Sequence, residues 1–286
     1  MPARSTRKFP SMMSSIAASD SAGRSTAMDA AVSIEQLSVR FGDVAALQDI
    51  SLAVQPGEFV AIVGPSGCGK TTLLNAISGL LPPEAAITGK IRLRAGTRLG
   101  YVFQKDALLP WFSALRNVEV GAELRGVARA ERRRLALELL QAMGLEGFAG
   151  HYPHQLSGGM RHRVALARAL AYDPDVVLLD EPFGALDAFT RLALEEQVLG
   201  IWRRTGKTML LVTHDLAEAL SLGKRIVVLT PRPGRIHTIV NVSWPEDLSL
   251  GELRTSEQFF ARLRELWDLL LSLGAAPGRA AKTGVL

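Results

Sequence analysis

The residues of this 286-residue chain that could do chemistry begin with a glycine-rich run that contains one lysine. The run is Gly64-Pro65-Ser66-Gly67-Cys68-Gly69-Lys70-Thr71-Thr72, and its glycines allow successive backbone N–H groups to point inward around phosphate oxygens. Lys70 is expected to reach the terminal phosphates of a nucleotide, and the Thr71 hydroxyl to hold Mg²⁺. The alternative is a glycine-rich turn without a ligand. A strand-like run before it and a helix-like run after it favour the nucleotide site.

A second group consists of two carboxylates, Asp180 and Glu181, which end the apolar run 176–179. Such a run is typical of a strand buried on both faces of a parallel sheet. Ligands gather at the carboxyl ends of these strands, so we expect Asp180 to hold Mg²⁺ through water and Glu181 to polarise an attacking water. An acidic turn is the alternative, and the glycine-rich run upstream makes the catalytic interpretation the better one.

His214 follows the strand expected over residues 208–213, at the same edge of the sheet. A lone histidine is usually structural, but a third polar group at this edge favours contact with the terminal phosphate. Ser157 is a good helix cap, and Gly158 and Gly159 leave the positive end of the following helix unobstructed. This helix start is therefore a second candidate anion site, far along the chain from the first.

The elements that must position these residues form an α/β pattern. A helix follows the glycine-rich run, and the segment from about 105 to 165 is mainly helical, including an arginine-rich helix that begins near Arg129. Because strands precede and follow it, we interpret this segment as a helical insert in an α/β domain. The expected strands cover residues 32–39, 47–54, 59–63, 90–93, 98–103, 175–180, 208–213, 225–229 and 235–240.

The two ends of the chain differ from the rest. Residues 1–31 are rich in Ser, Ala and Met, show no periodicity, and are expected to form a disordered tail, with Met28 as an alternative start. Residues 246–286 form a C-terminal extension in which 256–273 has apolar positions at helical spacing, followed by fraying after Gly274.

Composition narrows the possible partners and the compartment. The chain has 33 Lys and Arg against 28 Asp and Glu, a formal net charge of +5, which suits anionic ligands without choosing among them. Its single cysteine, Cys68, excludes an internal disulfide and indicates a reducing compartment. Cys68 sits in an electropositive loop that could lower its pKa and make it reactive; a small residue filling the loop is the alternative. No apolar run reaches the ~18 residues of a membrane span.

Six sequence features, taken in order, resemble those of the nucleotide-binding subunit of an ATP-binding cassette (ABC) transporter. They are the glycine-rich run, Gln104, residues 156–160, residues 176–181, Leu186-Asp187 and His214. The resemblance implies a P-loop NTPase (RecA-like) core with an N-terminal antiparallel β subdomain and an inserted α-helical subdomain, together spanning residues 32–245.

The same resemblance implies roles for individual residues. Phe41 would stack on adenine, although a core position is the alternative, and Gln104 would touch Mg²⁺ and face a membrane subunit. Residues 157–159 would be the signature motif. Asp187 would act across a dimer, and His214 would be the switch histidine.

Residues 102–111 and 152–155 are similar to importers of nitrate, sulfonates or taurine. Met160 and His162 stand where glutamine is common in this family, and Gly184 replaces a frequent serine. None of these departures removes a group assigned to catalysis, so we expect any effect to be on rate or coupling.

The resemblance implies an ATPase that uses ATP and Mg²⁺ and works as a head-to-tail pair. Its partners would be permease subunits at the cytoplasmic face of the inner membrane and, indirectly, a solute-binding protein. An ATPase for nucleic acid or the ribosome is a rival, but it usually carries coiled coils, two cassettes or zinc inserts, and we expect no nucleic-acid partner. A phosphotransferase is a second rival, and it would leave residues 156–160 without a role.

Overall fold

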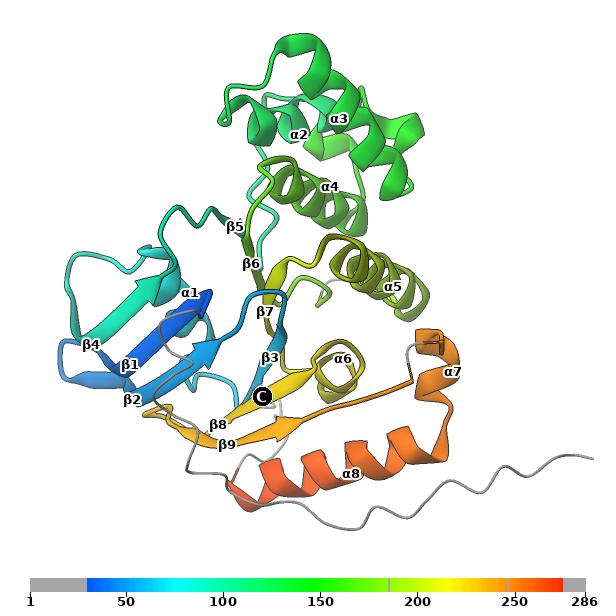
Figure 1. Ribbon diagram of the computed structural model, residues 1–286. Helices are drawn as coiled ribbons and strands as arrows, with labels where there is room; N and C mark the ends of the chain where they lie inside the picture. Colours follow the sequence, from blue (N-terminus) through cyan, green and yellow to red (C-terminus); the bar gives the residue numbers. More distant parts are fainter. Residues whose placement is uncertain (1–29, 185, 246, 275–286) are drawn as a thin grey trace, which may run out of the picture.

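Two β-sheets organise the computed structural model, which describes residues 30–184, 186–245 and 247–274 (Figure 1). The smaller is antiparallel with the strand order β2-β1-β4, and the larger has the order β5-β6-β7-β3-β8-β9. The larger sheet is parallel except for β9, which runs antiparallel to β8. The predicted α/β fold, with an N-terminal antiparallel subdomain and a helical insert, is confirmed.

The antiparallel sheet consists of β1 (Val32–Phe41), β2 (Val44–Val54) and β4 (Ala85–Leu93). Strand β4 begins earlier than the predicted residue 90 because Ala85 pairs with Phe41 at the far end of β1. Residues 30 and 31, which the sequence pattern assigns to the tail, are buried, and the Ala31 N–H donates to Val54 O. The rest of the predicted tail, residues 1–29, lies outside the described residues.

Three central strands of the larger sheet are completely buried, as their unbroken apolar runs predict. Helix α1 packs on one face through Leu73 and Leu74, and helix α4 packs on the other through residues such as Val164. The strands are β5 (Leu99–Val102), β6 (Val176–Asp180), β7 (Thr208–Val212), β3 (Phe59–Val63), β8 (Arg225–Leu229) and β9 (Ile236–Asn241).

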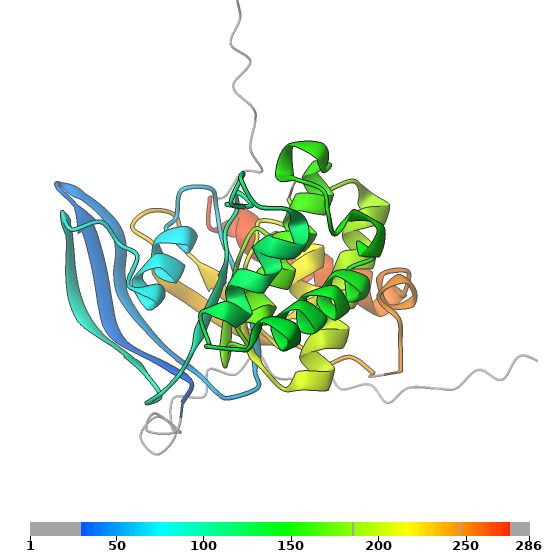
Figure 2. The same ribbon diagram turned by 90° about the horizontal axis from the view of Figure 1, so that it is seen from above.

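The helical insert stands to one side of the larger sheet, away from the antiparallel sheet (Figure 2). It comprises α2 (Ala114–Glu123), α3 (Arg129–Ala142), two short 3-10 turns at Glu146–Phe148 and Pro153–Gln155, and α4 (Gly158–Ala171). The buried Asn117 amide donates to the carbonyls of Leu109 and Phe112, which fixes the entry into α2. The insert therefore presents α4 to the sheet and its outer helices to solvent.

Five further helices complete the described part of the chain. Helices α5 (Ala188–Thr205) and α6 (Leu216–Leu222) connect strands of the larger sheet, whereas α1 (Lys70–Ser78) leads from β3 to β4 of the antiparallel sheet. In the C-terminal extension, α8 (Glu257–Ser272) matches the predicted helix, and its buried Phe259 and Leu266 attach it to the core. Helix α7 (Leu250–Arg254) was not predicted, and it is initiated by a capping box between Ser249 and Glu252. Residues 275–286 lie outside the described residues.

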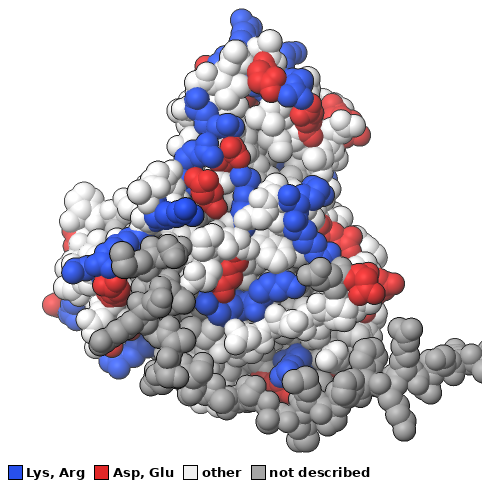
Figure 3. All heavy atoms as spheres, viewed as in Figure 1, with Lys and Arg blue, Asp and Glu red and all other residues white. Residues whose placement is uncertain are grey.

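Basic and acidic side chains are interspersed over the face of the molecule shown in Figure 3. Ion pairs on the exposed side of α3 join Arg134 to Glu131 and Glu138. Among the described helices, none combines the length and the apolarity that crossing a bilayer requires.

Candidate active site

The glycine-rich run forms a tight loop between β3 and α1. Gly69 has φ 103° and caps α1 without a side chain, and a Cβ added there would lie 2.7 Å from Leu47 Cδ2 and 3.0 Å from Ala46 O. The buried Lys70 amine donates to Gly64 O at 2.8 Å and to Pro65 O at 3.2 Å. Glycine is therefore required at position 69, where the loop approaches β2 closely, and the Lys70 amine lies among the carbonyls of the loop.

The loop is supported by a turn that the sequence marks only as a break between two strands. The Arg232 guanidinium donates to Gly67 O at 3.1 Å, and a Cβ added at Gly234 would lie 2.1 Å from Cys68 O. This turn, residues 231–234, thus packs directly against the glycine-rich loop. Its contact could not be predicted, because more than 160 residues separate Arg232 from Gly67.

Thr71, in the first turn of α1, meets Asp180 at the carboxyl end of β6. The Thr71 hydroxyl donates to Asp180 Oδ1 at 3.1 Å, and burial raises the pKa of Asp180. Tyr101, which the sequence analysis did not select, lies beside them: its hydroxyl donates to Asn75 Oδ1 at 3.0 Å, and burial and the nearby Asp180 raise its pKa. A hydroxyl and a buried carboxylate side by side are suitable ligands for a hard divalent cation.

Glu181, Gln104 and His214 also come together, although they come from three distant parts of the sequence. Gln104 Nε2 donates to Glu181 Oε2 at 3.0 Å, and His214 Nδ1 lies 3.2 Å from Glu181 Oε1. Glu181 has φ 46°, an uncommon backbone conformation for a residue other than glycine. Such strained residues cluster at functional sites. Gln104 and His214 therefore orient both carboxylate oxygens of Glu181, at the edge of the larger sheet where the glycine-rich loop also lies.

The second candidate anion site lies elsewhere in the fold. Ser157 caps α4, and its Oγ accepts from the Met160 N–H at 3.2 Å. Within the described residues, no hydrogen bond joins residues 157–159 to residues 64–72, and α4 and α1 pack on opposite faces of the sheet. A Cβ at Gly159 would lie 2.7 Å from Leu186 Cδ2. The chain thus brings the helix start close to the loop that carries Asp187.

Asp187 begins α5, and its Oδ1 accepts from the Thr190 N–H at 3.0 Å, a hydrogen bond that lowers the pKa of Asp187. Arg191 joins this loop to the loop after β7, since it donates to Leu186 O at 3.0 Å and to Asp215 Oδ2 at 3.2 Å. Arg191 could not be identified from the sequence, because its partner Asp215 lies 24 residues further along the chain. The loops of Asp187 and His214 therefore lie side by side.

Phe41 is half-buried at the end of β1 and packs against the core cluster that contains α1, so it is neither fully buried nor freely exposed. Cys68 is buried, and burial raises its pKa above the ordinary value despite the nearby Lys70. The hypothesis of a reactive, low-pKa thiol is therefore wrong, because loss of hydration outweighs the attraction of the lysine.

In the part of the chain that the structure describes, no cluster of three His, Cys, Asp or Glu side chains exists that could hold a metal alone. The residues present fit a different kind of site, in which a nucleotide shares the cation with Thr71 and Asp180. The glycine-rich loop and the Lys70 amine fit the phosphates of such a nucleotide.

Comparisons with known proteins agree with this geometry. The family described as "ABC transporter" matches residues 47–184. The "Taurine import ATP-binding protein TauB" of Yersinia pestis is 45% identical over 228 residues, covering 77% of this chain and 89% of the relative. An "Uncharacterized ABC transporter ATP-binding protein" of Methanocaldococcus jannaschii is 47% identical over 230 residues, covering 79% and 85%.

Among solved structures, a dimeric ATP-binding cassette in a post-hydrolysis state with ADP and Pi is similar, with a TM-score of 0.66 and 34% identity. It covers 75% of this chain and 100% of the cassette. The order of motifs, the fold and these relatives agree, and the chain belongs to the ATP-binding proteins of ABC transporters and is an ATPase.

Proposed function

We propose that this chain energises the uptake of a small solute, such as taurine, another sulfonate or nitrate, by closing as a head-to-tail pair around ATP. The observation that carries the catalytic part is the convergence of Gln104, Glu181 and His214 beside the glycine-rich loop. Taurine is supported by the names of relatives at 43–47% identity, and we propose it as the solute for this chain.

Each residue has a task that follows from its position. The Lys70 amine, which now donates to Gly64 O and Pro65 O, would exchange these carbonyls for phosphate oxygens of ATP. Glu181 would orient the attacking water, and Gln104 and His214 hold its carboxylate for that purpose. Phe41 would contact the adenine at the edge of the antiparallel sheet.

Thr71, Asp180 through water, and Gln104 would hold Mg²⁺. When bound, this cation would neutralise charge on the phosphates of ATP. The Thr71 hydroxyl already meets the Asp180 carboxylate at 3.1 Å, so one small ion between them requires little rearrangement.

Pairing of two copies follows from the separation of the two anion sites within one chain. The helix start at Ser157, Gly158 and Gly159 lies apart from the glycine-rich loop, so it would cover the ATP held by a second copy. Asp187, two elements further on, would lie at the same contact. Permease subunits at the cytoplasmic face of the inner membrane would receive the movement through Gln104 and the helical insert, and a solute-binding protein would deliver the cargo to them.

The test of the shared site uses Glu181→Gln in the full chain. This variant is expected to bind ATP, to form an ATP-dependent dimer, and to release phosphate about 10²–10⁴-fold more slowly, the usual effect of losing a general base. Glu138→Gln on the exposed face of α3 is the matched control and should retain turnover. Full turnover in Glu181→Gln would remove the glutamate from its role.

Ser157→Arg tests the second half of the site, because a bulky cation would obstruct the helix start. It should abolish ATP-dependent pairing and hydrolysis, and full ATPase activity would contradict the shared site. For the cargo, cells lacking this gene should lose uptake of labelled taurine and regain it with the wild-type chain but not with Glu181→Gln. Normal taurine uptake in the deletion strain would refute that choice of solute.

A further inference from the structure

Phe189 is exposed to an unusual degree for an aromatic residue. Its relative exposure is 90%, and within the described residues no other large apolar side chain reaches that value. It lies in the first turn of α5, two residues after Asp187, which caps that helix. Single exposed apolar residues are common, so its exposure gains meaning only from a matching surface.

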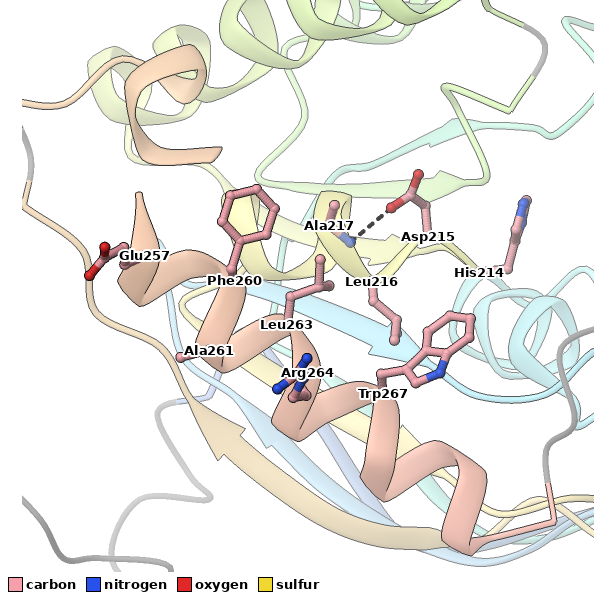
Figure 4. A pocket seen from close by; sticks show the side chains of 10 residues that line it. All are labelled: His214, Asp215, Leu216, Ala217, Glu257, Phe260, Ala261, Leu263, Arg264 and Trp267. Carbon is pink, nitrogen blue, oxygen red and sulfur yellow. Dashed lines mark hydrogen bonds between the residues drawn. The ribbon is translucent and has the colours of Figure 1, made fainter. Parts of the chain in front are cut away.

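A matching surface lies between α6 and α8. The groove there has a volume of about 860 Å³, and Figure 4 shows Phe260, Leu263 and Trp267 projecting from α8 toward Leu216 and Ala217 of α6. Phe260 is 59% exposed and Trp267 is 45% exposed, so these rings line the groove without filling it. This volume is within the range of about 300–1,000 Å³ that binding pockets have.

The groove is continuous with the candidate active site. His214 forms one end of the groove and also lies 3.2 Å from Glu181 Oε1. Arg191 connects Leu186 O, next to Asp187, with Asp215, which lines the groove. Phe189 and the His214 end of the groove therefore lie on neighbouring loops of one surface. Phe189 is nevertheless exposed to solvent and does not occupy the α6–α8 groove of its own chain.

We propose that Phe189 of each copy inserts into the α6–α8 groove of the other copy when two chains close around ATP. This inference rests on the head-to-tail arrangement under "Proposed function" and adds a contact to it. In a pair with two-fold symmetry, a projecting residue and a groove on the same surface meet twice, once in each direction. The C-terminal helix α8 thereby becomes part of the dimer contact and touches the loop of His214.

The expected effect on dimerisation is large because buried aromatic anchors commonly dominate interfaces. In the Glu181→Gln background with ATP, Phe189→Ala should raise the dimer dissociation constant about a hundredfold, since two contacts are lost and each is worth about tenfold. Leu124→Ala is the matched control, because Leu124 is 74% exposed but lies in the helical insert. Sedimentation velocity over a range of protein concentrations measures the constant.

A second measurement locates the contact. In the Glu181→Gln background, and at a protein concentration above the dissociation constant of the Phe189→Ala dimer, a chain carrying both Phe189→Cys and Ala261→Cys should form an ATP-dependent disulfide between copies on oxidation with copper phenanthroline, while either cysteine alone should not. The native Cys68 does not compete, because it is buried.

The outcomes separate the inference from the proposal on which it rests. If Glu181→Gln forms no ATP-dependent dimer, both are overturned. If that dimer forms but Phe189→Ala leaves its dissociation constant within about twofold, or if the double cysteine chain fails to cross-link, the contact of Phe189 is refuted and the shared ATP site stands. A weakened dimer together with the cross-link supports the contact.

Discussion

Glu195 on α5 offers the sharpest physical prediction, because it is a fully buried carboxyl with an incomplete set of partners. Its Oε2 accepts from the Arg254 guanidinium of α7 at 2.5 Å, whereas its Oε1 has no hydrogen-bond partner among the described residues. Burial raises the pKa of Glu195 from 4.5 to about 8, and the partly exposed Arg254 only reduces this shift. The protonated form is therefore favoured in the folded state near neutral pH.

The sign of the pH dependence follows from proton uptake. Between about pH 4.5 and 8 the folded state holds this proton and the unfolded state does not, so the free energy of unfolding falls as the pH rises. At ~1.36 kcal/mol per pKa unit, Glu195 contributes about 5 kcal/mol to the free energy of unfolding. This contribution is complete below the pKa of the unfolded state and is lost as the pH rises through the pKa of the folded state. Glu195→Gln keeps the shape of the side chain and removes this titration.

The assay is urea unfolding of wild type and Glu195→Gln across pH. Relative to the variant, the wild type should lose about 3 kcal/mol between about pH 5.5 and 8.5. Arg254→Gln should extend the loss to higher pH, because removing the cation raises the pKa of Glu195 further while the slope stays limited to one proton. A stability difference that stays constant with pH would show that Arg254 keeps Glu195 ionised throughout, and the reasoning from burial would be refuted.

Two further predictions concern the site itself. Arg191→Gln should leave ATP affinity within about twofold and lower turnover about tenfold, because the loops of Asp187 and His214 lose their shared partner, and Arg191→Lys should be intermediate. Nucleotide-binding and phosphate-release assays measure the two effects, and an equal loss of binding and turnover would contradict a positioning role. Native Cys68 should not react with a thiol reagent at neutral pH and should react fully after unfolding, because burial excludes the reagent and raises the thiol pKa; rapid native reaction would contradict this.

Much of the site could be predicted because its residues occupy local sequence patterns. Strand ends, the glycine-rich run and the capping serine each have a signature within a few residues, and the structure places Thr71 against Asp180 and Gln104 and His214 against Glu181. Since parallel strands end at one edge, their terminal residues had to be neighbours.

Other residues could not be predicted, because their meaning depends on distant partners. Arg232 supports the glycine-rich loop from 165 positions away, and Arg254 reaches the buried Glu195 from 59 positions away. The electropositive loop around Cys68 was visible in the sequence, but the burial that reverses its effect on the pKa was not.

The sequence by itself determined the order of the strands and helices, the phosphate loop and the acidic strand end, because backbone conformation and hydrophobic periodicity are local. The tertiary structure decided which side chains are buried, which of them contact one another, and which surfaces lie next to each other. Arg191 between two loops, the buried pair of Glu195 and Arg254, and the groove beside His214 all arise where segments far apart in the chain meet. Burial and packing depend on three-dimensional proximity, so no local pattern could encode them.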